Sequence, residues 1–156
     1  MGNFEVRPPL DGDAAVIACG MRPSDRREIW AASRFTPYEA LCYGQRHSTL
    51  CWTGVWKGRP IGMAGCAPGS LIGNVGYPWQ LATDEIEEAA LPYLRQSRRI
   101  FRTLRQSWGL LANWVDARNT VSIRWLKYMG FKIEEAAPYG VDGLPFHYFW
   151  MRGGMQ

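Results

Sequence analysis

Acidic side chains in the second half of the chain offer candidates for acid–base chemistry. Asp116 follows a predicted buried strand and can serve as a general base, although an ion pair with Arg118 or Arg124 is the more common role. Glu85, Glu87 and Glu88 can recognise an amine, but such runs more often begin a solvated helix. Both interpretations stay open on the sequence alone.

A row of arginines recurs at helical spacing opposite an apolar helix side. The row consists of Arg95, Arg98, Arg99, Arg102 and Arg105. Guanidinium groups bind the phosphates of a coenzyme or a nucleic acid, and a solvated helix face is the alternative. His47 and His147 are single histidines, for which satisfied surface or core positions are favoured over catalytic ones.

The composition indicates one globular domain over residues 1–156, with a disordered tail at 153–156. Hydrophobic residues make up 47 %, which supports a sizeable core, and the net charge of +4 is too small to indicate a dedicated nucleic-acid binder. No apolar run reaches membrane-spanning length and no leader opens the chain, so we expect a cytoplasmic protein. The four cysteines contain no CxxC pair, so we expect reduced thiols and no metal site.

The first half is expected to hold a strand, three helices and a hairpin. A strand is predicted at 4–8, a helix around 14–18 capped by Asp11 or Asp13, and a helix capped by Ser24. Thr36 followed by Pro37 predicts a third helix to about residue 46. Strands at 50–56 and 60–66 flank a turn at 57–59.

The second half is expected to continue with a strand at 77–83 and a helical stretch from residue 83 that Pro92 splits. A buried strand follows at 110–115, then a helix capped by Asn119 and ended by Gly130, then strands at 131–135 and 145–151. We therefore predict a mixed α/β fold. Trp79, Trp108, Trp114 and Trp125 are expected in the core or between two copies of a homodimer.

The segment Asn113–Phe131 resembles the GNAT (GCN5-related N-acetyltransferase) superfamily. It has the superfamily's strand, Asn, short amphipathic helix and terminal Gly-Phe, and Asn119 and Gly130 keep the eleven-residue spacing. The hairpin at 58–62 is similar to the second and third strands of that fold. A Pro-Trp strand, a Thr-Asp-Glu stretch and the Asp-Ala-Arg-Asn helix start most resemble short GNAT-like proteins of tailed bacteriophages.

The resemblance implies an α/β fold with a central twisted mixed sheet of six or seven strands and helices on both faces. It implies acetyl transfer from acetyl-CoA to an amine on a small molecule or a protein. In GNAT folds two parallel strands splay apart, and unpaired backbone groups there bind the pantetheine arm of acetyl-CoA. By analogy the splay lies between 79–83 and 111–115, and cofactor contacts fall on Leu81, Ala82, Thr83 and Asn119.

Two departures from the superfamily pattern are visible. The Gly-rich pyrophosphate loop is replaced by 83–92, which holds four acids and a proline, so phosphate contacts are expected from Arg95, Arg98 or Arg99. Leu126 stands where many members carry a tyrosine general acid, so Tyr128, Tyr139 or Tyr148 would have to replace it.

We take Tyr128, Tyr148 and Asp116 as the catalytic candidates. Leu81, Ala82, Thr83, Arg98, Arg99 and Asn119 are the cofactor candidates. The alternative is a GNAT-like phage protein without catalysis, acting in the virion or on the host. A third interpretation, a basic nucleic-acid-binding module, is supported by the arginine row alone.

Overall fold

The computed structural model describes residues 3–70 and 72–154. The strands are β1 (Phe4–Arg7), β2 (Leu50–Trp56), β3 (Arg59–Ser70), β4 (Val75–Ala82), β5 (Leu110–Asp116), β6 (Lys132–Tyr139) and β7 (Leu144–Arg152). The helices are α1 (Asp13–Cys19), α2 (Pro23–Ser33), α3 (Pro37–His47), the 3-10 helix η1 (Asp84–Glu87), α4 (Ala90–Ser107) and α5 (Thr120–Met129). The predicted order of elements is therefore confirmed in these residues.

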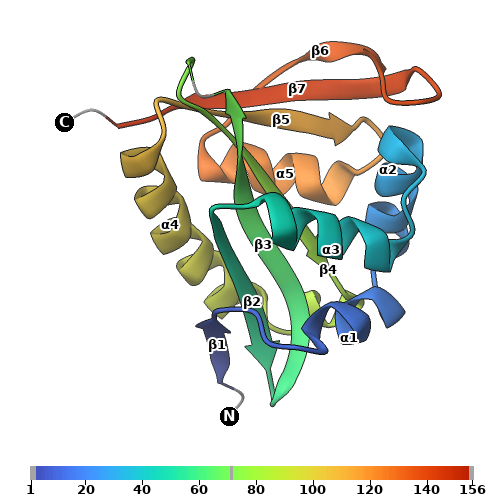
Figure 1. The fold of residues 1–156 in the computed structure, drawn as a ribbon, viewed down its shortest axis with the longest axis vertical. Coiled ribbons are helices and arrows are strands. Elements are labelled where there is room, and N and C mark those ends of the chain that lie inside the picture. Colours follow the sequence, from blue (N-terminus) through green and yellow to red (C-terminus); the bar gives the residue numbers. More distant parts are fainter. Residues whose placement is uncertain (1–2, 71, 155–156) are drawn as a thin grey trace.

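Within the described residues the strands form one mixed sheet in the order β1-β2-β3-β4-β5-β7-β6 (Figure 1). Neighbouring strands are antiparallel except β4 and β5, which are parallel and are joined through η1 and α4. This is the mixed α/β architecture with helices on both faces that the sequence predicts.

Capping residues explain where several elements begin and end. Thr36 and Glu39 form a reciprocal capping box at the start of α3. Asn119 caps α5 through its side chain, and Gly130 ends that helix at a φ of 101°, which favours glycine. The β2–β3 turn places Lys57 and Gly58 at positive φ, as tight hairpin turns require.

Three predicted boundaries are corrected. The residue preceding α2 is Arg22 rather than Ser24, because Pro23 takes the first helical position, where no amide donor is needed. Gly12, not Asp11 or Asp13, precedes α1, without a side-chain cap. Pro92 lies in the first turn of α4 and does not split that helix.

Helices cover both faces of the sheet, and each face has its own apolar cluster (Figure 1). On one face α1, α2 and α3 pack Ile17, Ile29 and Leu41 against Met63 and Leu81. On the other face α4 and α5 pack apolar residues against β5 and β7. These include Leu104, Leu111, Val115, Leu126, Phe149 and Met151. The first helical layer thus packs on β3 and β4, and the second on β5 and β7.

The C-terminal segment is held to α4 and to the start of β5. The amides of Gly153 and Gly154 donate to the carbonyls of Gly109 and Arg105, at 2.8 and 2.9 Å. The predicted tail at 153–156 is thus ordered at its first two residues, and residues 155–156 lie outside the described part. Among the described helices none is long and apolar enough to span a membrane.

Candidate active site

The parallel strands β4 and β5 separate soon after they meet. Only Val75 with Leu110 and Gly76 with Leu111 pair in the described residues, whereas β5 pairs with β7 along its whole length. Beyond these pairs, the Asn113 side chain donates from Nδ2 to the Pro78 carbonyl at 3.0 Å, which bridges the widening space. We call the space between residues 78–82 and 113–116 the β4–β5 gap.

Peptide groups of β4 alternate between β3 and the gap. The Thr83 amide donates to Ile61 of β3 at 2.8 Å, so the groups of Ala82 face the gap. There the Ala82 amide donates to Asp25 Oδ2 at 3.0 Å, and its carbonyl accepts from the Arg22 amide at 2.9 Å. By the same alternation the peptide of Gln80 faces the gap, and the described part of β5 supplies no ladder partner for it.

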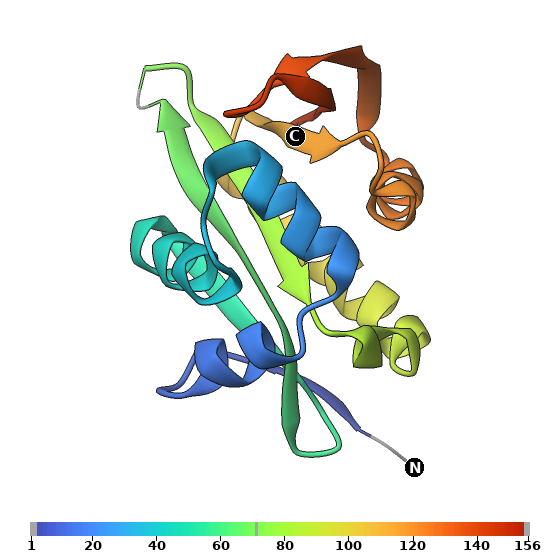
Figure 2. The same ribbon diagram turned by 90° about the vertical axis from the view of Figure 1, so that its right-hand side faces the viewer.

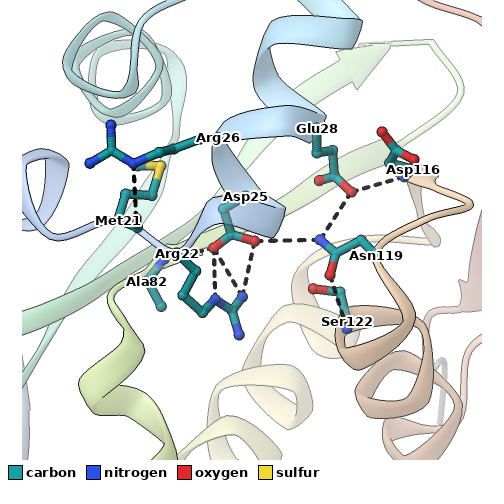
Figure 3. A network of polar contacts seen from close by, with 9 residues as sticks. All are labelled: Met21, Arg22, Asp25, Arg26, Glu28, Ala82, Asp116, Asn119 and Ser122. Atoms are coloured by element: carbon teal, nitrogen blue, oxygen red, sulfur yellow. Dashed lines mark hydrogen bonds and ion pairs between the residues drawn. The ribbon is translucent and has the colours of Figure 1, made fainter.

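Helix α2 lies across the gap (Figure 2). Two of its carboxyl groups close the open end. Asp25 reaches β4 through the Ala82 amide. One turn further, Glu28 Oε1 reaches β5 and accepts from the Asp116 amide at 2.8 Å. Between them Asn119 Nδ2 lies 3.4 Å from Asp25 Oδ1 and 3.3 Å from Glu28 Oε1 (Figure 3). This chain of contacts fixes the separation of the two strand ends.

The Asp25 carboxylate is fully buried and has Arg22 as its counter-ion. Arg22 Nε and Nη2 donate to Asp25 at 2.9–3.1 Å (Figure 3). Burial raises the pKa of Asp25, while Arg22, the Ala82 amide and Asn119 oppose that rise. Removing either member of such a pair leaves an uncompensated buried charge. The hydrogen bonds of Arg22 and Asp25 to Ala82 anchor α2 to β4.

The far end of α2 is anchored to the β6–β7 turn. The Val141 amide donates to the Ala31 carbonyl at 3.2 Å, and Arg34 forms an ion pair with Asp142. Gly140 has a φ of 77°, and a Cβ there would lie 2.5 Å from the Ala31 carbonyl oxygen. With both ends of α2 held, the position of Glu28 between them is fixed.

A cavity of about 380 Å³ passes through the β4–β5 gap. Its lining comes from α2 and α3 on one face of the sheet, from α4 and α5 on the other, and from both gap edges. The lining residues at the gap edges are Pro78, Trp79, Gln80, Leu81, Asn113, Trp114 and Val115. The volume lies within the range of small-ligand pockets, roughly 300–1,000 Å³. The cavity therefore borders the gap on both faces of the sheet.

Glu28 lines this cavity, and its pKa is raised well above the ordinary value of a glutamate. Its side chain keeps some accessible surface because it faces the cavity, yet protein surrounds the carboxyl group. Burial, together with the charges of Asp25 and Asp116, raises the pKa of Glu28 to about 8, against hydrogen bonds from the Asp116 amide and Asn119. A carboxyl group with a pKa near neutrality is suited to general base catalysis.

On the α4–α5 side the cavity presents a donor without a partner. The indole N–H of Trp125 is buried and makes no hydrogen bond to the described residues. An indole nitrogen can only donate, and leaving it unsatisfied is costly. A carbonyl group of a bound ligand would satisfy it.

The sequence-predicted acidic residues lie in structural contacts. Asp116 binds Arg118 at 2.6 and 3.0 Å and does not line the cavity. Burial would raise the pKa of Asp116, but the hydrogen bonds from Arg118 outweigh it and hold that pKa below its ordinary value. In the acidic run, Glu85 pairs with Arg59 and Glu88 with Lys57, so these acids bind the β2–β3 turn.

The structure brings two other predicted residues together outside the cavity. Arg98 of α4 donates to the Tyr128 hydroxyl at 2.8 Å and lies over its ring, and Tyr128 is 54 % exposed. Arg99 is also exposed. Tyr148 packs its ring on Trp114 at 5.3 Å and borders a shallower hollow beside Arg152. Catalytic and cofactor roles for these residues stay predictions.

The chain matches no family model and no curated protein. Its fold matches solved acetyltransferases. An N-acetyltransferase from Staphylococcus aureus Mu50 superposes with a TM-score of 0.74 at 14% identity, covering 97% of this chain and 99% of that one. The chain has the GNAT fold.

Two further structures with this fold were solved with coenzyme A or acetyl-CoA. The putative acetyltransferase yncA from Salmonella typhimurium, with acetyl-CoA, matches at a TM-score of 0.68 and 14% identity over 99% of this chain and 96% of that one. Aminoglycoside acetyltransferase AAC(6')-Ib, with coenzyme A, matches at a TM-score of 0.66 and 18% identity, covering 96% of this chain and 95% of that one. The GNAT fold expected from the Asn119–Gly130 motif is thus confirmed.

Within this GNAT fold, sequence reasoning missed Glu28, Gln80 and Trp125. A signal for Glu28 was present, because Asp25, Glu28 and the apolar Ile29 share one face of a helix. Two acids beside a buried apolar residue indicate that the acids also face inward. Gln80 carried no such signal, since its contribution is a backbone group.

Proposed function

We propose that this protein is an acetyltransferase that moves the acetyl group of acetyl-CoA to the nitrogen of an amine. The cavity through the β4–β5 gap is the observation that carries the proposal. A transferase with two substrates gains most of its rate by holding both reacting groups in one place. A passage open to both faces lets a thioester from one side meet an acceptor from the other.

The α4–α5 side of the cavity fits the amide-rich arm of acetyl-CoA. The Gln80 peptide faces the gap, and the Trp125 indole N–H is an unsatisfied donor on the same route. The Gln80 peptide can pair with an amide group of the arm, and the Trp125 N–H can donate to a carbonyl of the arm. Arg98 and Arg99 of α4 form no ion pair within the described residues and are available for phosphates.

The cofactor contacts proposed here differ from those that the sequence predicts at Leu81–Thr83. Thr83 donates to β3, Leu81 pairs with Met63, and the Ala82 amide is bound by Asp25. Cofactor contacts at Ala82 would require Asp25 to release that amide. We therefore assign the backbone contact to Gln80, one gap-facing position earlier.

Glu28 is the residue that we assign as general base. Acetyl-CoA supplies an acetyl group activated as a thioester. Glu28 faces the cavity at the gap and takes one proton from the bound ammonium, which leaves a neutral amine able to attack. The second proton lost by that nitrogen neutralises the sulfur, so the coenzyme leaves as a free thiol and the amide is neutral.

A pair of substitutions at Gln80 tests the cofactor route. Gln80→Pro removes the gap-facing N–H and leaves the β3 ladder intact, since that N–H does not face β3; Pro78 already occupies an equivalent position. Gln80→Ala is the matched control because it changes the side chain and keeps the amide. We expect wild type and Gln80→Ala to bind acetyl-CoA in calorimetry, and Gln80→Pro to bind about tenfold more weakly.

Equal affinities for Gln80→Pro and Gln80→Ala would remove the proposed contact. Absence of heat for the wild type at millimolar acetyl-CoA, with the protein folded, would remove acetyl transfer itself. Thermal unfolding of each variant provides the folding control.

A second candidate is a GNAT-fold protein without catalysis, and one observation favours it. Asp25 and Arg22 fill the open end of the gap. By the resemblance, the acids of η1 replace the loop that would hold a pyrophosphate, which they would repel. In the phage setting implied by the resemblance, such a protein would act in the virion or on the host. The acetyl-CoA titration separates the two candidates.

A further inference from the structure

The α2–α3 side of the cavity, which we call the acceptor chamber, is built mainly from aromatic side chains. They come from α3, β4, β5, β6 and the segment before α3. They are Phe35, Tyr43, Tyr77, Trp79, Trp114 and Tyr139. Since the whole cavity measures about 380 Å³ and a cofactor arm shares it, this chamber admits a small body only.

Two stacked aromatic pairs shape the walls. Trp114 of β5 stacks on Tyr139 of β6 with ring centroids 4.6 Å apart and planes 15° from parallel. Tyr43 of α3 stacks on His47 at 4.0 Å. Both pairs line the cavity, so the chamber offers flat faces of the kind that favour a flat ligand or a cation.

Trp79 is fixed in position by two glycines and a hydrogen bond. A Cβ on Gly44 would lie 2.6 Å from the Trp79 ring, and one on Gly65 would lie 2.9 Å from its Nε1. That nitrogen donates to Ser48 Oγ at 2.7 Å. The wall formed by Trp79 is therefore rigid, which favours selection by shape.

The ionisable groups that line the cavity favour a cation, because a bound ammonium beside Glu28 stabilises the ionised carboxylate. Glu28 is the one carboxylic acid among the described lining residues, and no lysine or arginine occurs among them. A single acid matches a single ammonium group, whereas a polyamine would bury further charges without partners. A carboxylate acceptor would meet Glu28 with no lysine or arginine among the described lining residues to offset it.

We propose that the acceptor is a small primary monoamine with a flat aromatic body, held with its ammonium group at Glu28 and its ring among Trp79, Trp114 and Tyr139. This inference depends on the proposed acetyl transfer and names its acceptor class. The reacting nitrogen then lies beside the base, and the aromatic walls contact the body and the cation.

The test measures binding of amines without coenzyme, so that it is separate from the acetyl-CoA titration. The probes are 2-phenylethylamine, its neutral isostere 2-phenylethanol, the acid 3-phenylpropionate, spermidine and the aminoglycoside kanamycin. Each is titrated by calorimetry into wild type, Glu28→Gln, Trp114→Leu and the control Trp30→Leu. Trp30 is on α2, is 53 % exposed and does not line the cavity.

We expect 2-phenylethylamine to bind wild type at least about tenfold more tightly than every other probe. The titrations are run at about pH 9, where the Glu28 carboxyl is ionised and a primary amine still carries its proton. Glu28→Gln should then lose about tenfold or more for the amine and leave 2-phenylethanol unchanged, because only the charge is removed. Trp114→Leu should weaken the binding of both 2-phenylethylamine and 2-phenylethanol, while Trp30→Leu should bind both as wild type does. Preference for spermidine or kanamycin, equal binding of 3-phenylpropionate, or no binding of 2-phenylethylamine would overturn the acceptor class; acetyl-CoA binding would still stand.

Discussion

Substitution of Glu28 by glutamine should stabilise the protein increasingly as the pH rises. The glutamine keeps the oxygen that accepts from the Asp116 amide and Asn119, so the hydrogen bonds persist. What changes is that residue 28 can no longer gain or lose a proton. Burial raises the pKa of Glu28 from 4.5 to about 8, and the groups that face it are Asp25, Asp116, Asn119 and Tyr139.

The sign follows from which state holds the proton. Below pH 4.5 Glu28 is protonated in both folded and unfolded chains, and the substitution has no charge effect. Between pH 4.5 and about 8 the unfolded wild type releases this proton while the folded protein keeps it, so wild-type stability falls as the pH rises. Above about 8 the difference is constant.

The magnitude is large on the scale of domain stability. One pH unit over this range corresponds to about 1.4 kcal/mol. The rise from 4.5 to about 8 therefore lowers wild-type stability, relative to Glu28→Gln, by about 3–5 kcal/mol at high pH. Many single domains have a free energy of unfolding of only about 5–15 kcal/mol.

Urea unfolding followed by tryptophan fluorescence at a series of pH values measures this difference. Other titrating groups are shared by both proteins and cancel in the comparison. We expect the stability difference to open between pH 5 and 8 at about 1.4 kcal/mol per pH unit and then level off. Two parallel stability curves would refute the raised pKa and with it the assignment of Glu28 as a base near neutral pH.

Three further predictions follow from other contacts. Asp13→Asn should cost roughly 2–3 kcal/mol at neutral pH, because Asp13 is buried and binds Arg7 and Thr53. Its pKa is lowered, so this cost in urea unfolding should shrink as acid protonates the wild-type carboxylate; a constant cost would contradict the account. Gly44→Ala should displace Trp79 and weaken 2-phenylethylamine binding several-fold with acetyl-CoA affinity kept; unchanged amine affinity would exclude Trp79 as a wall. Arg98→Ala should weaken acetyl-CoA binding about tenfold at low salt and less at high salt, whereas a salt-independent loss would exclude a phosphate contact.

The fold could be predicted wherever local chemistry decides it. Thr36 with Pro37 begins α3, and Asn119 with Gly130 bounds α5, because side-chain caps and left-handed glycine act within a few residues. The start of α2 was wrong because a proline at the first helical position outweighed the serine cap. These features depend on neighbours in sequence.

The site depended on contacts between distant segments, which sequence patterns do not reveal. Asp25 and Ala82 lie 57 positions apart, and Glu28 and Asp116 lie 88 apart. The carboxyl of Glu28 is unusual only because α2 crosses the gap and buries it. The alternative role of Asp116, an ion pair with Arg118 or Arg124, needed no such contact, and the structure has Arg118 as the partner.

The most direct test of the central claim observes the Gln80 amide while acetyl-CoA is added. The chain has five glutamines, Gln45, Gln80, Gln96, Gln106 and Gln156, so selective nitrogen-15 labelling gives few backbone signals, and Gln80→Ala identifies the one from β4. We predict that the Gln80 signal shifts to saturation and that its hydrogen exchange slows. A saturable response confined to Gln96 and Gln106 on α4, with Gln80 unmoved, would contradict a thioester arm in the β4–β5 gap.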